Sequence, residues 1–511
     1  MTKRARTAFE VVRGRRYSLG YDAIDGTIRR RSPQKKTAAE ITALSASGRD
    51  CASATARDDR RNMSLLAWMI RRHLDNVSRF TPHFRLGESP DLQAVNDAVA
   101  RLLRWHGRRS QFDALRRHGR NEWLRMFEAT KIIDGDCGGL KAKGGRLQGI
   151  EGSRIRKPTG AQAKQDAKIA KRIEAVTDEG VTLNPDDSVN EYCVCRRDKT
   201  TLVFEQLIPA ADLLFDGYWP ERFDSNRGVS PLLTALNEAA DVRETWQWLI
   251  LKAKTTALMG LMFNRTGSDE MLPTMGDPAT EAPATETASY AAQLAAAVKA
   301  RSIISMDLDQ GETVTEVGSN TPNPTVIPFT RELIRSVLLA LDIPFTFYDS
   351  LTASFSARIA DRNEYEESCE WKREKNQDVL AEIYAWLFPI WATADLFGFG
   401  SALKAAQIDP LEAAAALRWV PAGRPWLDRA NEMSGHILAL AAGVTSTPRI
   451  CAAYGDDAYV IAREQAAYLE AAGAPLLYAQ GGQIAVQAIM AGMGQQPAQD
   501  APPDNSADAA E

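Results

Sequence analysis

Residues 226–256, NRGVSPLLTALNEAADVRETWQWLILKAKTT, contain the pattern that most constrains the architecture of this 511-residue chain. Ser230 followed by Pro231 is a favourable helix start, with serine as the N-cap and proline at the first helical position. Apolar residues then recur at helical spacing as far as Ala253. The pattern predicts one uninterrupted helix from Pro231 to about Thr256, a rod roughly 39 Å long at 1.5 Å per residue.

The sequence changes character after this helix. Residues 265–287 are rich in proline, threonine and glutamate and have no periodic pattern, which is typical of a loop insertion. The elements expected around that loop are a strand at 258–263, a helix at 288–300, and strands at 302–306 and 313–317. A second helix, with an apolar stripe through Phe329, Leu333, Val337 and Leu341, is expected to end before Pro344.

A loop is predicted at residues 345–357, FTFYDSLTASFSA, which contain no lysine or arginine and a single acid, Asp349. A long helix is expected behind it, from about Ser356 to Trp391. This helix is densely charged in its first half and apolar in its second, with Pro389 as an expected kink.

The N-terminal half is expected to contain helices followed by a small β unit. Residues 1–57 are basic and predict a flexible arm, which either contacts phosphate or an acidic partner or is a solvated tail. Helices are predicted at 58–77, within 91–130, and at 425–442, 447–454 and 456–471, and strands near 181–183, 192–197 and 202–207. An acidic tail, 494–511, is expected to be disordered.

The region from Arg101 to Arg125 combines arginines with aromatic residues. Such a mixture can bind nucleic acid, but at helical spacing aromatics more often form core while arginines form a solvated face. Both interpretations stay open. The residues are Arg101, Arg104, Arg108, Arg109, Arg116, Arg117, Arg120 and Arg125, with Trp105, Phe112, Trp123 and Phe127.

Bulk composition limits the classes of protein. Hydrophobic residues at 44% and charged residues at 25% are typical of a folded globular chain. A formal net charge of −4 argues against a protein whose main function is tight binding of nucleic acid. The sequence shows no run of about 20 apolar residues and no secretory signal, so we expect no membrane partner, a cytosolic location and reduced cysteines.

Motifs of catalysis are weak or missing in the sequence. The five histidines show no metal-ligand spacing, and the glycine-rich segment 138–149 lacks the Gly-Lys-Ser/Thr ending of a P-loop. Asp134 and Asp136 are interpreted as acids of a turn, and Cys193 and Cys195 as structural thiols on one face of a strand. We therefore expect a protein that is not an enzyme, without catalytic residues, metal or cofactor.

The ordered motifs resemble the lambda family of phage portal proteins. Residues 226–231 resemble the family's arginine-glycine approach to the first stem helix, and residues 354–358 resemble a Ser-x-Ser-x-Arg-like element that opens a long charged helix. Residues 443–447 and 454–457 resemble the family's closing helix-turn-helix signature. The β-α-β-β excursion, the returning helix and the Pro-initiated loop follow in family order between them.

This resemblance implies a helix-rich α+β portal fold that assembles into a cyclic ring, usually of twelve subunits. The implied parts are a basic arm (1–57), a wing (58–229), a first stem helix (230–256), a clip (257–322), a second stem helix (323–344), a tunnel loop (345–357), a long wing helix (358–400), a helical crown-like region (401–493) and a tail (494–511).

The implied function is to form the ring at one capsid vertex of the virion, through which double-stranded DNA is packaged and ejected. Implied partners are further copies of the chain, sequence-independent DNA in the channel, the large terminase subunit, a head-completion adaptor, and the major capsid and scaffold proteins. The alternative is a non-portal DNA-packaging or capsid interaction protein that binds nucleic acid through the Arg101–Arg125 region. An unrecognised nuclease is a third hypothesis.

Two sets of site residues follow from the resemblance. A conduit must surround DNA without holding it, and each fixed base would add an attraction that is broken at every step. The loop is therefore hypothesised to approach the duplex, unless it is a plain interhelical hinge, through Phe345, Thr346, Phe347, Tyr348, Asp349, Ser350, Thr352, Ser354 and Phe355. The acids of the clip, which either contact terminase and adaptor or keep the loop soluble, are Asp269, Glu270, Asp277, Glu281 and Glu286.

Overall fold

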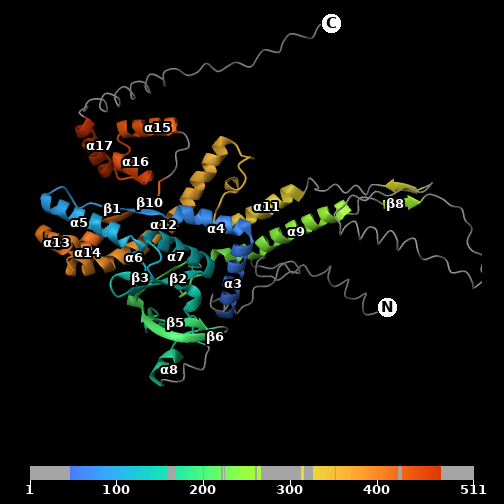
Figure 1. Ribbon diagram of the computed structural model, residues 1–511, viewed down its shortest axis with the longest axis horizontal. Helices are drawn as coiled ribbons and strands as arrows, with labels where there is room; N and C mark the ends of the chain where they lie inside the picture. The colour runs from blue at the N-terminus through green and yellow to red at the C-terminus, as the bar shows by residue number, and fades with distance from the viewer. Residues whose placement is uncertain are drawn as a thin grey trace, which may run out of the picture. The chain divides into compact units, whose positions relative to one another are not determined.

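The computed structural model describes residues 46–158, 167–198, 201–219, 223, 225–258, 262–265, 312–315, 326–351, 353–423 and 429–472. The chain divides into two compact units (Figure 1). Unit 1 comprises Met1–Asp59, Ala67–Pro231 and Arg362–Glu511, and unit 2 comprises Arg60–Leu66 and Leu232–Asp361. Long helices and short antiparallel strands together confirm the predicted helix-rich α+β class.

Unit 1 is mostly helical. Its helices, apart from residues assigned to unit 2, are α3 (Ala46–Asn62), α4 (Ser64–Val77), α5 (Pro90–His106), α6 (Arg109–Phe112), α7 (Arg120–Asp134), α8 (Ala167–Glu174), α12 (Phe355–Thr393), α13 (Phe399–Ala406), α14 (Pro410–Ala415), α15 (Arg429–Ala441), α16 (Thr447–Ala453) and α17 (Ala458–Ala472). Because α3 begins at Ala46, the flexible arm predicted to reach residue 57 is too long by about one helix.

Helix α5 shows how local sequence sets these elements. The Ser89 side chain accepts a hydrogen bond from the Leu92 N–H, and Pro90 occupies the first turn, as an N-capped start requires. Val95, Val99 and Leu102 then fall on one buried face. The helix therefore contributes one apolar stripe to the core and leaves the opposite stripe to solvent.

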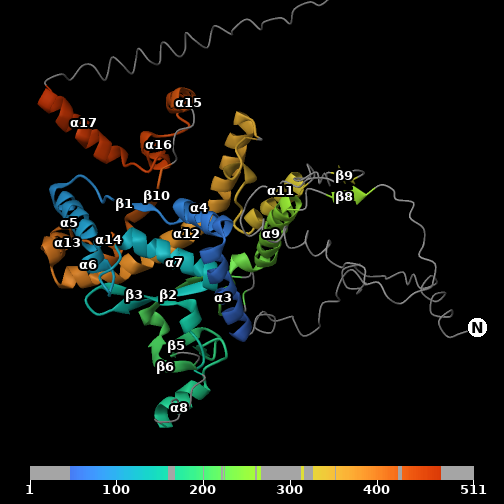
Figure 2. The same cartoon turned by 45° about the vertical axis from the view of Figure 1, so that its right-hand side comes forward.

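Three antiparallel sheets accompany these helices. A two-stranded sheet pairs β1 (Phe80–Phe84) with β10 (Leu417–Pro421), and a second sheet has the order β3 (Arg146–Glu151), β2 (Asp136–Ala142), β7 (Leu213–Gly217). The third contains β4 (Val181–Leu183), β5 (Val189–Asp198) and β6 (Thr201–Pro209), all in predicted positions. Sequence patterns missed β1, β2, β3, β7 and β10. Helix α7 packs against the β2–β3 hairpin (Figure 2).

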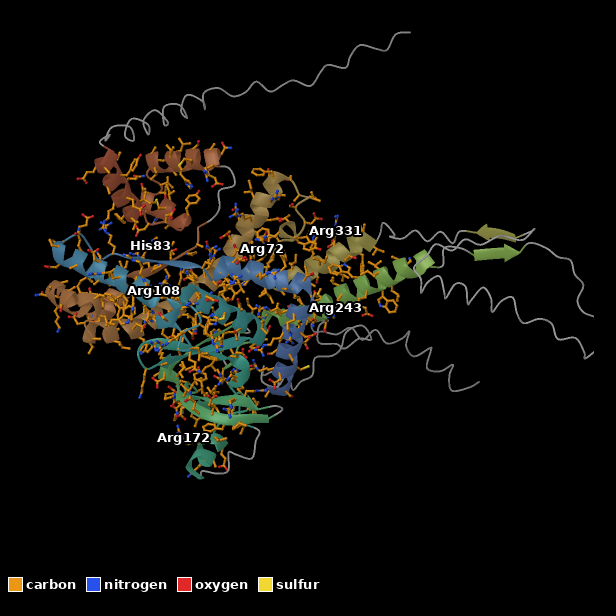
Figure 3. All side chains as sticks on the ribbon, viewed as in Figure 1. Arg72, His83, Arg108, Arg172, Arg243 and Arg331 are labelled. Carbon is orange, nitrogen blue, oxygen red and sulfur yellow. The ribbon has the colours of Figure 1, made fainter. Side chains whose placement is uncertain are left out.

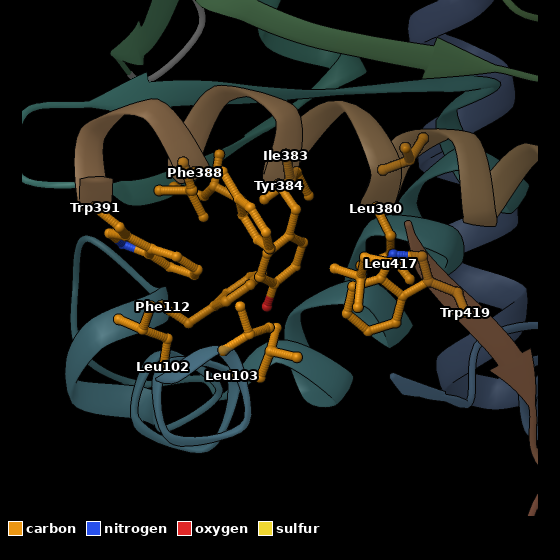
Figure 4. Close-up of a cluster of buried hydrophobic side chains, with 14 of the residues drawn as sticks. Leu102, Leu103, Phe112, Leu380, Ile383, Tyr384, Phe388, Trp391, Leu417 and Trp419 are labelled. Atoms are coloured by element: carbon orange, nitrogen blue, oxygen red, sulfur yellow. The ribbon is translucent and has the colours of Figure 1, made fainter. Parts of the chain in front are cut away.

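The main core of unit 1 lies between α5, α7, α12 and α13. Figure 4 shows Tyr384, Phe388 and Trp391 of α12 pointing toward Leu102 and Phe112. These α12 side chains are at most 2% exposed, and Phe388 also contacts Phe84 and Phe399. The apolar second half predicted for the long helix is therefore the centre of this core.

Unit 2 is built around two helices. Its described elements are a 3-10 turn (Pro231–Thr234, the proline belonging to unit 1), α9 (Leu236–Leu258), β8 (Met262–Arg265), β9 (Glu312–Thr315), α11 (Val326–Leu339) and a 3-10 turn (Phe345–Phe347). Helices α9 and α11 pack together, and β8 pairs antiparallel with β9. The predicted uninterrupted helix from Pro231 is wrong in its first turn, because the α-helix begins at Leu236.

Other expectations have mixed outcomes. All six cysteines lie in the described residues and are free, and Cys193 and Cys195 are both buried on β5. The predicted helix at 288–300 and strand at 302–306 lie outside the described residues. Across the described part of the chain no single helix is long and apolar enough to cross a bilayer, while one pair bent by 104°, Phe355–Thr393 with Leu396–Ala406, passes that test together.

Candidate functional site

The approach to α9 is held by a buried arginine. The Arg227 guanidinium forms a two-pronged ion pair with Asp136, with Nε to Oδ2 at 2.7 Å and Nη2 to Oδ1 at 2.8 Å. It also donates to the carbonyl oxygens of Ile155 (2.6 Å), Glu179 (2.6 Å) and Gly152 (2.8 Å). Three separate segments of unit 1 therefore converge on one side chain, four residues before the chain leaves for unit 2.

Glycine follows Arg227 for a steric reason. A Cβ on Gly228 would lie 2.1 Å from the carbonyl oxygen of Gly135, and Gly135 itself has a φ of +95°. The close approach lets the Gly228 N–H donate to Asp136 Oδ2 at 3.0 Å, so the carboxylate has three donors. The arginine-glycine motif is thus one buried contact, in which only glycine permits the backbone to come close enough.

Helix α3 packs onto this anchor. Arg49 donates to the Gly228 carbonyl, Arg57 pairs with Asp134 at 2.8 Å, and Arg156 pairs with Asp50. Burial raises the pKa of Asp134 although Arg57 opposes this, and burial disfavours the Arg227 charge but Asp136 outweighs it, so that the pKa of Arg227 is raised. The interpretation of Asp134 and Asp136 as ordinary turn acids is wrong, because both are partners of structural arginines.

The first half of the 345–357 loop is attached to α11. The Phe345 ring is buried and lies 4.8 Å from the Arg335 guanidinium, and its centroid is 5.7 Å from that of Tyr348. Asp349, the acid of the loop, forms an ion pair with Arg331 at 3.2 Å. The loop contains no base, as its sequence shows, but two arginines of α11 lie against it.

The second half of the loop projects into solvent. Leu351 is 94% exposed, and Tyr348, Ser350, Ser354 and Phe355 are exposed as well. The Ser354 side chain accepts from the Ala357 N–H at 3.2 Å and so caps the start of α12. Of the hypothesised contacts, Phe345 is a core residue and Thr352 lies outside the described residues. The exposed Leu351 was missed, because the predicted contacts were aromatic, hydroxyl or acidic residues.

A buried charge cluster attaches α12 to the rest of unit 1. Lys131 of α7 pairs with Glu128 at 2.7 Å and Asp216 at 2.6 Å, and donates to Asn376 Oδ1 of α12 at 3.1 Å. Asn376 in turn donates to the Val77 carbonyl at 3.0 Å. Burial opposes the charge of Lys131, but Glu128 and Asp216 outweigh it and raise the pKa of Lys131.

A cluster of hydrogen-bonding groups around His73 lies beside the Lys131 charge cluster. His73 of α4 lies 3.5 Å from the Tyr218 hydroxyl and 3.3 Å from the Tyr365 hydroxyl, and Tyr218 donates to Glu128. Burial, together with Lys372, lowers the pKa of His73 well below its usual range. These groups face one another rather than a cavity, so they hold α4, α7 and α12 together.

The buried His106 of α5 is expected to make the free energy of unfolding depend on pH. Its Nε2–H donates to the Gly145 carbonyl at 2.9 Å, and burial lowers the pKa of His106 to about 4. The unfolded chain has a value near 6.5, so below that pH the unfolded state takes up the proton first and stability is lost progressively down to about pH 4. The expected loss between pH 7 and pH 4 is roughly 3 kcal/mol.

Urea titrations of the wild type and His106→Gln at several pH values measure this effect. The glutamine keeps a donor for Gly145 but does not titrate, so the midpoint should depend less steeply on pH. His73 is expected to retain part of the slope. An unchanged slope in the variant would show that the proton uptake occurs elsewhere.

The aromatic residues of the Arg101–Arg125 region are part of the core. Phe112, Trp123 and Phe127 are at most 3% exposed, and Trp105 is half-buried. Arg120 stacks over the Trp419 ring at 5.0 Å, and Arg125 pairs with Asp75 at 2.7 Å. The core interpretation of the aromatics is confirmed, and the remaining arginines are exposed.

The clip acids Asp269, Glu270, Asp277, Glu281 and Glu286 lie outside the described residues. Among the residues that are described, no three His, Cys, Asp or Glu side chains are grouped so that they could hold a metal ion.

The fold is that of a helix-rich α+β protein in which a buried arginine holds the approach to a pair of packed helices. Residues 27–371 match the family model described as phage portal protein, lambda family, and the chain belongs to that family. The match includes the Arg227 anchor, unit 2 and the start of α12, and the resemblance seen in the sequence is confirmed.

Solved structures with a similar chain come from gene transfer agent particles. A chain of the native particle virion has 13% identity and a TM-score of 0.42, over 81% of this chain and 99% of that one. A chain of the native neck, computed with C12 symmetry, has 13% identity and a TM-score of 0.41 over 79% and 97%. A chain of the empty-particle neck, with C6 symmetry, has 13% identity and a TM-score of 0.42 over 79% and 93%. No curated protein sequence matches.

Proposed function

We propose that this chain is the subunit of a portal ring at one capsid vertex of a virion, through which double-stranded DNA enters and leaves. Its family membership supports this role. The observation that supports assembly into a ring is the surface of unit 2. Helices α9 and α11 bury one face against each other and leave large apolar side chains exposed to solvent. These exposed residues are Trp248, Ile250, Ile327, Phe329 and Leu339.

The C-terminal helices support self-assembly independently. Within residues 429–472 no side chain of α15, α16 or α17 is buried, although Met433, Leu440 and Val460 are apolar. Helices of 7–15 residues gain most of their stability from packing. Neighbouring copies in a ring, proposed as twelve, would supply the missing contacts, because cyclic symmetry presents one surface to another at every subunit boundary.

The ring is tested by placing a charge on the exposed apolar face of α11. Phe329→Asp with Leu339→Asp should change the stability of the single subunit by about 0.5 kcal/mol or less per site, because both side chains are exposed. The same change should abolish annular particles in negative-stain images and reduce the mass by light scattering to that of a monomer. Leu351→Asp, on a leucine outside α11 that is also highly exposed, is the control and should leave rings intact.

The exposed half of the loop is proposed to face the duplex in the bore. Tyr348, Ser350, Leu351, Ser354 and Phe355 offer weak contacts without a fixed positive charge. Ser350→Lys with Leu351→Lys should slow ATP-driven filling several-fold, since each close lysine–phosphate contact adds roughly 1 kcal/mol in water and recurs in every copy. The neutral pair Ser350→Gln and Leu351→Gln controls for size, and equal filling rates for both variants would contradict the proposal.

The remaining partners are proposed from family membership alone. The acids of residues 257–322 would meet the large terminase subunit and later a head-completion adaptor, and the wing would meet major capsid and scaffold proteins. We further propose that assembly takes place in the host cytoplasm. The proposed portal role requires no catalytic step of this chain.

A further inference from the structure

Six exposed arginines gather at one end of α5 and on the turns that follow it. We call Arg101, Arg104, Arg108, Arg109, Arg116 and Arg117 the arginine face. Arg101 and Arg104 direct their Nε–H groups at carbonyl oxygens of their own helix, those of Asp97 and Ala100, each at 3.3 Å. Among the residues that the structure describes, none of the six forms an ion pair with a carboxylate.

The fold brings the arginines of α5, Arg101 and Arg104, close to those of the segment that follows it. The Arg120 N–H donates to the Gly107 carbonyl at 3.1 Å, which closes residues 108–119 into a loop. Within that loop, the backbone N–H of Arg117 donates to Asp113 Oδ2 at 2.8 Å, and Arg116 adopts a φ of +58°. The loop therefore holds two arginines at its start and two near its end, beside the α5 arginines; Figure 3 shows Arg108 at this position.

The concentration of arginines distinguishes this face, because exposed arginines without a carboxylate partner, such as Arg79 and Arg418, also occur singly elsewhere in the described part of unit 1. Arg57, Arg125, Arg154, Arg156 and Arg172 all pair with a carboxylate at the surface or below it. In a chain of net charge −4, acids are available for pairing. Six unpaired like charges on one face repel one another, so their concentration is best explained by an anionic partner outside the subunit.

The chemistry of the face favours phosphate over an acidic protein. A protein interface needs buried apolar or aromatic anchors, and Leu115 is the large apolar side chain exposed beside these arginines, whereas Phe112 and Leu102 are buried. Residues 101–125 contain eight arginines and no lysine, and the forked guanidinium of arginine binds phosphate oxygens in pairs. From Arg101 to the end of α5 at His106 the helix covers about 7.5 Å, a length over which duplex DNA carries roughly four charges.

We propose that the arginine face binds the phosphate backbone of duplex DNA without sequence preference. The face belongs to unit 1, whereas the loop proposed for the bore belongs to unit 2, so it is a second DNA contact. This proposal rests on the proposed function in one respect, which is that a portal subunit meets the duplex stored in the particle. The proposal also differs from the alternative stated above, in which the chain is a non-portal protein and this region is its main nucleic-acid contact.

The test uses assembled rings and a covalently closed duplex minicircle. A closed circle cannot thread a closed ring, so its binding reports the outer surface and not the bore. Six phosphate contacts predict that affinity falls by about 10³-fold between 50 and 200 mM salt. In the variant Arg101→Gln, Arg104→Gln, Arg108→Gln, Arg109→Gln two contacts remain, so this fall should shrink to about 10-fold, and affinity at 50 mM salt should drop at least 100-fold.

The control variant removes four exposed arginines elsewhere in unit 1, none of them on α15, α16 or α17: Arg71→Gln, Arg72→Gln, Arg79→Gln, Arg418→Gln. It should bind the minicircle within about three-fold of wild type. Equal losses in both variants, or no binding by wild-type rings in 50 mM salt, would overturn the proposal, and tighter binding of poly-glutamate than of DNA would assign the face to an acidic protein. If no rings form, the proposed function fails, and linear duplex with the monomer still tests the arginine face.

Discussion

Replacing Arg227 by methionine is expected to destabilise unit 1 by roughly 3–5 kcal/mol, because the change leaves the Asp136 carboxylate buried without its positive partner. Arg227 is 4% exposed and Asp136 is fully buried, so water cannot replace the lost donors. The carbonyl oxygens of Gly152, Ile155 and Glu179 also lose their guanidinium donors. Breaking a buried pair costs far more than the pair contributes relative to apolar residues.

Urea unfolding followed by tryptophan fluorescence measures this effect. Arg125→Met is the matched control, since its pair with Asp75 is largely solvated and is worth about 1 kcal/mol or less. The double variant Arg227→Met with Asp136→Leu should recover part of the loss, because it removes both charges. A loss below about 1 kcal/mol for Arg227→Met would show that the anchor is not what stabilises the approach to α9.

Replacing Phe388 by alanine is expected to cost about 3–5 kcal/mol, because the ring is fully buried and fills the space between four other aromatic side chains. Its ring centroid lies 6.2 Å from that of Phe84, 5.5 Å from that of Trp391 and 5.4 Å from that of Phe399, and Tyr384 is at 6.4 Å. These neighbours come from β1, α12 and α13, so no single element can move to close the cavity.

The same unfolding assay compares Phe388→Ala with Ile390→Ala. Ile390 lies two residues away on the same helix but is 38% exposed, so its truncation should cost about 1 kcal/mol or less. Similar losses for both variants would contradict the assignment of Phe388 to the core centre. Rings should still form with Ile390→Ala, because the change leaves the face of α9 and α11 untouched.

The local elements with strong periodicity could be predicted from the sequence. The helices α5, α9, α11, α12, α16 and α17 and the strands β4, β5 and β6 lie close to their predicted ranges. The first turn of the α9 rod was predicted wrongly, because Ser230-Pro231 satisfies the rules for a helix start while the first four residues adopt a tighter 3-10 turn. The β1–β10 pair was missed, because its strands are more than 330 residues apart and each is short.

The candidate site was predictable only in part. The Arg227-Gly228 motif is visible in the sequence, but its partner Asp136 is 91 residues away and resembles an ordinary turn acid. The same holds for Lys131, whose partners Asp216 and Asn376 come from different segments. In the loop, Phe345 and Leu351 are both apolar, and only packing against α11 separates the buried residue from the exposed one.

The sequence by itself determined the helix-rich α+β class, the order of the segments and their resemblance to portal proteins, because these depend on periodicity and on short motifs. The tertiary structure decided which charges are neutralised. Ion pairs depend on which distant segments meet, and burial multiplies the cost of an unmatched charge. Hence Arg227 became a structural anchor and six arginines of α5 and its turns stayed exposed, although the sequence alone shows the same side chain at every one of these positions.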